Sequence, residues 1–217
     1  MLKENKNNSS SRSRTKDIRF RLKVAGFALI AGLVSSIAIS GLLLMVEKVT
    51  SVPMGSFYLV LMLAITGSKV YSLDMIAYGL LLHIIAGSLI GLVMGIPFII
   101  RNKKRSSIGI ISKYAPIYGL GFGFALWSLL FIPITLSMIL PMLNDLQDRT
   151  ITQQVPTGKI TSISTQGLLA MQNRIIGGAL AFNMFYGLLV AIMICSYNES
   201  LFRKEFHKDA MHDVGNF

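Results

Sequence analysis

A histidine within a long apolar stretch is the residue of this chain best suited to chemistry. His83 lies in GLLLHIIAGSLIGLVMG, which runs from Gly79 to Gly95. A neutral imidazole can form a hydrogen bond, exchange a proton near neutral pH, or ligate a metal or haem. Because ionisable residues are costly inside a membrane, His83 is a functional-site hypothesis if its segment crosses the bilayer.

A second apolar stretch carries an asparagine at a matching position. Residues 82–91 read LHIIAGSLIG and residues 182–191 read FNMFYGLLVA, so His83 aligns with Asn183. Each of these two residues lies eight positions after the start of an uncharged run. The alignment predicts an internal repeat in which His83 and Asn183 lie at similar depth. They should form a buried hydrogen-bonded pair, with His83 neutral at pH 7.

The small residues around these two positions indicate close packing between helices. Lipid provides no hydrophobic force between helices, so their association depends on close contact and on interhelical hydrogen bonds. We favour a structural role for His83, in which it packs between helices and forms one hydrogen bond. One alternative is that it exchanges a proton or binds a ligand, and the other is that it ligates haem or a metal. The predicted packing residues are Gly79, Gly87, Gly91, Gly95, Gly187 and Ala191.

Other chemistry is sparse along the chain. Asn173 and Arg174 precede the last apolar run, where interfacial snorkelling is favoured over substrate binding. The chain contains no CxxC, HExxH, P-loop or GxSxG motif, and Cys195 is its only cysteine. We therefore expect no catalytic residues, no metal site and no cofactor, and interpret the protein as a non-enzyme.

Long uncharged helices must position these residues. A membrane-spanning helix needs about 20 predominantly apolar residues. Four runs of 23 to 31 residues lack Asp, Glu, Lys and Arg, and Pro133 should kink the third of them. The runs must be helical because lipid cannot satisfy free backbone groups. The predicted spans are about 24–46, 75–100, 114–141 and 172–196.

Basic residues gather on one side of such a four-span chain. Of 21 Lys and Arg residues, 16 fall in residues 1–23, in residues 101–113, or after Asn198. This positive-inside bias predicts a multi-pass protein of the cytoplasmic membrane, with both termini and the middle loop cytoplasmic, rather than a nucleic-acid binder. We expect residues 1–23 to be disordered. The four-helix domain should cover 24–198, and 199–217 should form a cytoplasmic tail.

The apolar run FYLVLMLAI at residues 57–65 is too short to cross the bilayer. A crossing there would also move residues 101–113 to the face opposite the basic N-terminus. We predict a short interfacial or re-entrant helix near 53–67, starting at Pro53 and ending at Gly67. The predicted fold is therefore all-α. It is a polytopic membrane helix bundle of four transmembrane helices, arranged as two hairpins of parallel topology, plus this short helix.

Three features of this arrangement occur together in one known family. They are Gly26 and Gly32 in the first span, Pro53-Met54 before the short helix, and the His-x3-Gly-x3-Gly series that starts at His83. Over roughly residues 24–198 the chain resembles the YagU-type four-helix integral membrane proteins. It departs from their pattern where Asn183 replaces a second histidine. The resemblance implies a membrane location and this fold, and no particular activity.

Two classes of function fit these observations. The favoured one is a small transporter or channel-type subunit, in which His83 and Asn183 line the interface between the two halves. The alternative is a non-catalytic scaffold or accessory subunit of a larger membrane complex. Four short helices enclose little volume, so either role requires a homo-oligomer or partner membrane subunits. The expected surroundings are the lipid bilayer, without nucleic acid.

Overall fold

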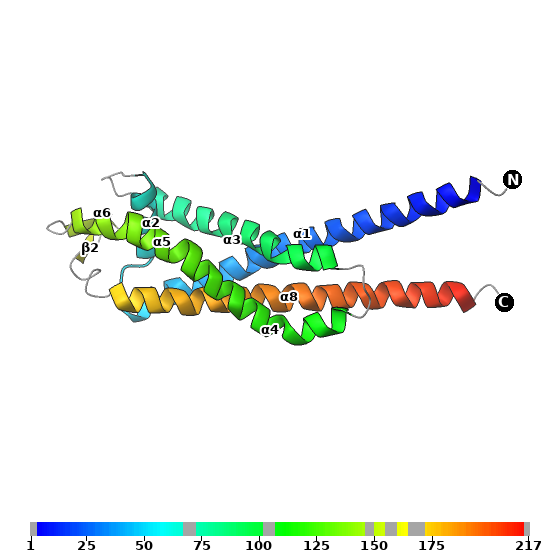
Figure 1. The fold of residues 1–217 in the computed structure, drawn as a ribbon. Helices are drawn as coiled ribbons and strands as arrows, with labels where there is room; N and C mark the ends of the chain where they lie inside the picture. The colour runs from blue at the N-terminus through cyan, green and yellow to red at the C-terminus, as the bar shows by residue number, and fades with distance from the viewer. Residues whose placement is uncertain are drawn as a thin grey trace.

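The computed structural model describes residues 4–66, 73–101, 107–145, 150–154, 160–164 and 172–214. Four of its helices are long and apolar enough to cross a membrane: Ile18–Val49, Asp74–Ile100, Lys113–Asp145 and Arg174–Leu201. This confirms the four-span helical bundle. Figure 1 shows both ends of the chain at the same end of the molecule, which we call the termini end. The opposite end is called the α2 end.

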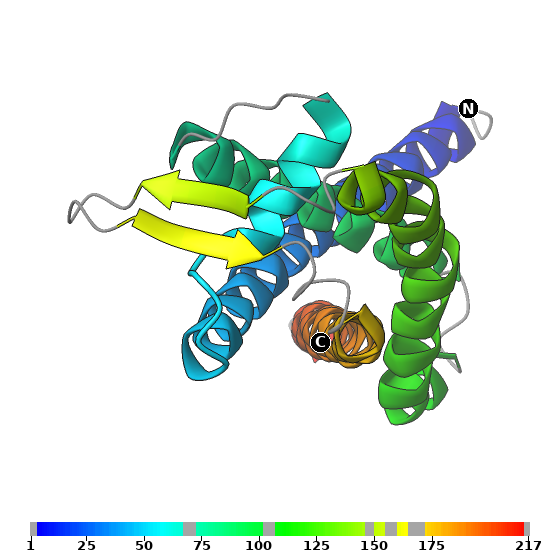
Figure 2. The same cartoon turned by 90° about the vertical axis from the view of Figure 1, so that its left-hand side faces the viewer.

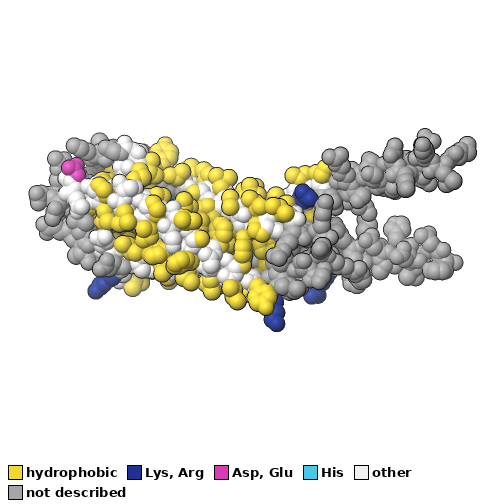
Figure 3. Space-filling view, in the orientation of Figure 1, with side chains coloured by type: hydrophobic (Ala, Val, Ile, Leu, Met, Phe, Trp, Pro, Cys, Tyr) yellow, Lys and Arg dark blue, Asp and Glu magenta, His cyan; other side chains and the backbone are white. Residues whose placement is uncertain are grey.

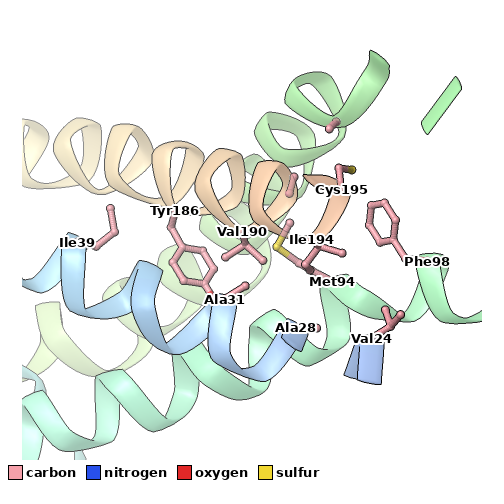
Figure 4. Close-up of a cluster of buried hydrophobic side chains, with 12 residues drawn as sticks. Val24, Ala28, Ala31, Ile39, Met94, Phe98, Tyr186, Val190, Ile194 and Cys195 are labelled. Carbon is pink, nitrogen blue, oxygen red and sulfur yellow. The ribbon is translucent and has the colours of Figure 1, made fainter. Parts of the chain in front are cut away.

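The long helices form two hairpins. In the first hairpin, α1 (Glu4–Val49) packs along α3 (Leu73–Arg101). In the second, α4 (Ser107–Leu126) packs along α8 (Gln172–Val214), which also contacts α1. Buried side chains of α1, α3, α4 and α8 form the core between the hairpins, and Figure 4 shows Tyr186, Val190 and Ile194 directed from α8 toward the first hairpin.

The outer surface of the bundle is apolar. Large hydrophobic side chains are exposed along every span, including Leu129 and Ile117, which are 73% and 68% exposed. Figure 3 shows hydrophobic side chains along the described part of the bundle, with the visible charged side chains at the two ends of this apolar stretch. Such an exposed surface requires lipid around it, because a soluble monomer rarely exposes so much contiguous apolar area.

The third span is one helical element with two wide turns. α4 continues through the π-helical segment η1 (Trp127–Phe131), α5 (Ile132–Ile134), the π-helical segment η2 (Thr135–Ile139) and α6 (Leu140–Asp145). Pro133 lies between the two π segments. A proline lacks the N–H that an α-helix needs and its ring crowds the preceding turn, so local widening accommodates it. The helix continues past Pro141, where the sequence predicted its end, to Asp145.

The α2 end carries the short elements. Helix α2 (Ser56–Thr66) lies across this end and contacts α3 and η2 (Figure 2). It begins three residues after Pro53, and Gly67 lies outside the described residues. Strands β1 (Thr150–Gln154) and β2 (Ile160–Ser164) form an antiparallel pair, with Thr150 opposite Ser164. The expected short helix is therefore present, and this small hairpin was not foreseen.

The terminal segments continue the spans as helix. Helix α1 starts at Glu4 and α8 extends to Val214, so the predicted domain boundaries at 23/24 and 198/199 fall inside continuous helices. For residues 4–23 the structure thus shows helix where the sequence predicted a disordered segment. Adding residues to an existing helix avoids the cost of nucleation, which an isolated polar segment would have to overcome.

Candidate functional site

Glycines hold α1 against α3 at backbone distance. A Cβ atom added to Gly32 would lie 2.5 Å from the carbonyl oxygen of Gly87 and 2.9 Å from the Cα of Gly91. A Cβ atom added to Gly91 would lie 2.6 Å from the carbonyl oxygen of Ala28. These distances are too short for any side chain. Ser88 also donates a 2.9 Å hydrogen bond from α3 to the carbonyl of Leu29 on α1.

The second hairpin is joined in the same manner. A Cβ atom on Gly119 of α4 would lie 2.5 Å from the carbonyl oxygen of Gly187 and 2.9 Å from the Cβ of Ala191. A Cβ atom on Gly123 would lie 2.5 Å from the Cα of Met184. The glycines of the second hairpin therefore pack α4 against α8, just as those of the first hairpin pack α1 against α3.

The four-residue series on α3 turns around its helix. Gly87, Gly91 and Gly95 face α1, where a Cβ atom on Gly95 would lie 2.6 Å from the Cβ of Ala28. Gly79 faces α2 instead, because a Cβ atom there would lie 2.7 Å from the carbonyl oxygen of Tyr58. A step of four residues advances 400°, so the series drifts by about 40° per step. One series therefore serves two different neighbours.

His83 lies at the junction of α3 with α2. Its ring centroid is 5.8 Å from that of Tyr58, and the two rings are tilted by 60°. Its Nε2 atom is buried and has no hydrogen-bond partner among the described residues. Buried polar atoms are paired in the large majority of cases, with protein or with ordered water, so an unpaired one calls for an explanation.

Two hydroxyl groups at the same junction share this property. The Oγ atom of Ser40 on α1 and the phenol oxygen of Tyr58 on α2 are buried and have no described partner of normal geometry. The two residues are 4% and 1% exposed. Burial raises the pKa of the Tyr58 phenol, while the neighbouring Ser40 hydroxyl opposes the shift and the charge of Glu47 adds to it. We call Ser40, Tyr58 and His83 the α2-end polar cluster.

A buried carboxylate lies next to this cluster. Glu47 on α1 is 5% exposed and accepts two backbone hydrogen bonds, from the N–H of Gly55 at 2.6 Å and from the N–H of Phe57 at 2.9 Å. These donors belong to the N-terminus of α2, where the first N–H groups of a helix have no partner within it. The carboxylate therefore caps α2 and compensates the positive end of its dipole.

The structure does not bring His83 and Asn183 together. The amide nitrogen of Asn183 donates a 2.8 Å hydrogen bond to the carbonyl of Ala179 in its own helix. Its backbone carbonyl packs against Gly123 of α4. The predicted hydrogen-bonded pair is thus absent, because each polar residue faces a neighbour within or beside its own hairpin rather than the opposite hairpin.

Two tyrosines make the polar contacts between the hairpins. The phenol of Tyr186 on α8 donates a 2.5 Å hydrogen bond to the carbonyl of Gly87 on α3. The phenol of Tyr118 on α4 donates a 3.1 Å bond to the carbonyl of Met94 on α3. A carbonyl oxygen has two lone pairs, so it can accept a tyrosine while keeping its helical bond.

The candidates at the start of the last span belong to α8, whereas the cluster is formed by α1, α2 and α3. Arg174 is exposed at the α2 end of α8. The side chain of Asn173 lies outside the described residues. Near them, the indole N–H of Trp127 donates a 3.1 Å hydrogen bond to the carbonyl of Ile176, which ties the π-helical segment η1 to α8.

Sequence reasoning missed the residues that surround His83. Ser40, Glu47 and Tyr58 gave no spacing signal, since they come from two elements that meet only in the fold. Glu47 offered one clue, because it directly follows an uncharged run and precedes the Pro53 turn by six residues. Tyr186 was hidden within an apolar run whose orientation only packing defines.

Comparison of the chain with protein-family models, with curated proteins and with solved structures finds no match. A fold alone does not determine a function, so function must be inferred from the chemistry of the cluster itself.

Proposed function

We propose that the protein is a small transporter or channel-type subunit that passes a small polar or cationic solute through the α2-end polar cluster. The observation that carries this proposal is the set of buried polar atoms on Ser40, Tyr58 and His83, none of which makes a hydrogen bond of normal geometry to a described residue. Leaving a buried polar group unsatisfied costs about 1–3 kcal/mol. The Nε2 atom of His83 has no described partner, and the hydroxyls of Ser40 and Tyr58 neighbour each other without a bond of normal geometry, so the junction favours a polar solute that enters and leaves.

The composition of the cluster restricts that partner. Hydroxyl and imidazole groups can both donate and accept hydrogen bonds, which suits water, protons and small polar solutes. The nearby Glu47 carboxylate makes the junction unfavourable for anions. The resemblance to the YagU-type proteins supports the membrane helix bundle in this proposal, and the transport role does not depend on it.

Loss of the His83 imidazole should abolish pH-dependent flux. Purified protein in liposomes that contain a pH-sensitive dye should acidify faster than protein-free liposomes under a potassium diffusion potential. His83→Leu should return that rate to the protein-free level, because it removes a proton-exchanging group from the cluster. Asn183→Leu is the matched control and should retain flux, since Asn183 is bonded within its own helix.

A wild-type protein that leaves the acidification rate at the protein-free level in this assay would contradict the transport proposal. The alternative, a scaffold or accessory subunit, is supported by one observation. The third span is the least buried. In its most apolar 18-residue stretch 11% of the residues are buried, against 28–33% in the other three spans. It therefore has the largest surface free for a partner helix or a second copy. Purification in mild detergent would then yield a stoichiometric partner subunit.

We also propose that the termini end faces the cytoplasm of a cell whose plasma membrane holds the protein. The basic residues of 1–23 and 101–113 support this orientation through the positive-inside rule. The basic segments at both termini also suit contact with anionic headgroups.

Thiol labelling should report this orientation. In a Cys195→Ser background, a membrane-impermeant reagent added to intact cells should modify Arg174→Cys and should leave Lys113→Cys unmodified. Both positions are exposed, and they lie near opposite ends of the bundle. Permeabilised cells should label both variants. Labelling of Lys113→Cys alone in intact cells would reverse the proposed topology.

A further inference from the structure

We propose that α2 is a hinged cover over the α2-end polar cluster and that the Glu47 carboxylate holds it closed. This inference rests on the proposed transport role of the cluster and adds the regulation of access to it. Four observations support it: the position of α2, the bonds of Glu47, the backbone of the connecting turn, and the packing of Tyr58.

Helix α2 supplies one wall of the cluster. Tyr58 lies in the first turn of α2 and is 1% exposed, while Ser40 and His83 belong to α1 and α3. Leu59 and Leu63 of α2 pack against Met75 and Ile76 of α3 in a small satellite core that is separate from the main core. Movement of α2 away from the bundle would therefore withdraw Tyr58 and expose Ser40 and His83.

The connection between α1 and α2 has the geometry of a hinge. Just after the end of α1, Ser51 has a φ of 57°. Its N–H donates to the carbonyl of Lys48, and the N–H of Val52 donates to the carbonyl of Glu47, which is the pattern of a Schellman motif. Gly55, with a φ of 86°, then precedes α2. Two left-handed residues on either side of a short turn concentrate the change of chain direction between two helices.

Glu47 spans this turn. One carboxylate oxygen accepts the N–H of Gly55 and the other accepts the N–H of Phe57, so a side chain of α1 fixes both the turn and the start of α2. Hydrogen bonds to an ionised group are stronger than neutral ones. Beyond the turn itself, α2 is retained by contacts with α3, including the close approach of Tyr58 to Gly79, and with η2. Removing the carboxylate should therefore weaken the attachment of the first turn of α2 and let it open more often, while its contacts with α3 and η2 and the bundle of long helices persist.

Thiol accessibility tests the cover. In a Cys195→Ser background, Ser40→Cys should react slowly with a small membrane-impermeant thiol reagent, because position 40 is covered. Adding Glu47→Ala should raise the reaction rate by about tenfold or more, as expected from the loss of two charge-assisted bonds. Glu47→Gln should give an intermediate rate, since the amide keeps one acceptor oxygen.

Ser35→Cys is the matched control. Ser35 lies on the same helix, is 1% exposed, and has a buried hydroxyl without a described partner, as Ser40 does. Local opening of α2 predicts that Glu47→Ala leaves the Ser35→Cys rate unchanged. Equal acceleration at both positions would indicate general loosening of the bundle and would overturn the cover, as would an unchanged rate at position 40. The measurement uses no flux, so absence of transport with Glu47-dependent labelling would refute the proposed function and leave the cover intact.

Discussion

Gly91→Leu should separate α1 from α3 and lower the free energy of unfolding in detergent by about 3 kcal/mol, near the upper end for overpacking. A Cβ atom at position 91 already lies 2.6 Å from the backbone of both Ala28 and Gly32, and backbone atoms cannot rotate aside. The additional carbons of leucine would have to force two helices apart along the whole contact. Denaturant titration of the purified protein, followed by its circular dichroism, measures the change.

Gly121→Leu is the control for this substitution. Gly121 is exposed on α4, and nothing lies within 4 Å of a Cβ atom placed there. It should leave stability nearly unchanged or increase it slightly, because leucine is a better helix former than glycine. Equal loss of stability in both variants would mean that α1 and α3 do not approach as closely as the structure indicates.

Tyr186→Ala should have an effect of similar size, a loss of about 3 kcal/mol from the free energy of unfolding. Tyr186 is 7% exposed and packs within the core between the two hairpins. Its phenol also bonds to the Gly87 carbonyl at 2.5 Å. The substitution therefore removes both a large buried ring and a polar link between α8 and α3.

Two variants separate these contributions. Tyr186→Phe keeps the ring and should cost only about 1 kcal/mol, the usual net value of one hydrogen bond. Phe185→Ala removes an aromatic ring of similar size from the adjacent residue, which is 41% exposed, and should cost much less than Tyr186→Ala. If Phe185→Ala were as destabilising as Tyr186→Ala, α8 would have to present a different face to the first hairpin.

The spans and the short helix were predictable because they depend on local properties. A run of more than 20 uncharged residues has few stable alternatives to a membrane helix. The nine apolar residues at 57–65 were too few for a span, and the structure places α2 there. Pro133 predicted a disturbance of the third helix, although the sequence could not specify that two π-helical segments would absorb it.

The sequence predicted that helices pack closely through small residues, but it did not predict which helix each of these residues contacts. Small residues at Gly87, Gly91 and Gly187 indicated close packing, but their spacing does not say which helix they meet. The similarity of His83 and Asn183 suggested that they face each other. In the fold, Asn183 lies against α4 and His83 lies beside Tyr58. Pairing of elements that are distant in sequence depends on complementary surfaces, and a single sequence does not reveal those.

The unbroken helical path of the third span has a consequence for the membrane around the protein. Its 33-residue candidate span, from Lys113 to Asp145, corresponds to about 50 Å of ideal helix, whereas the hydrocarbon layer of a bilayer is about 30 Å thick. Such hydrophobic mismatch is relieved by tilting, by bending at Pro133, or by local thickening of the bilayer. The helix should therefore respond to acyl-chain length more than its 27- and 28-residue neighbours do. Lipid composition would then change the angle at which η1 packs against α8 and the angle at which η2 packs against α2.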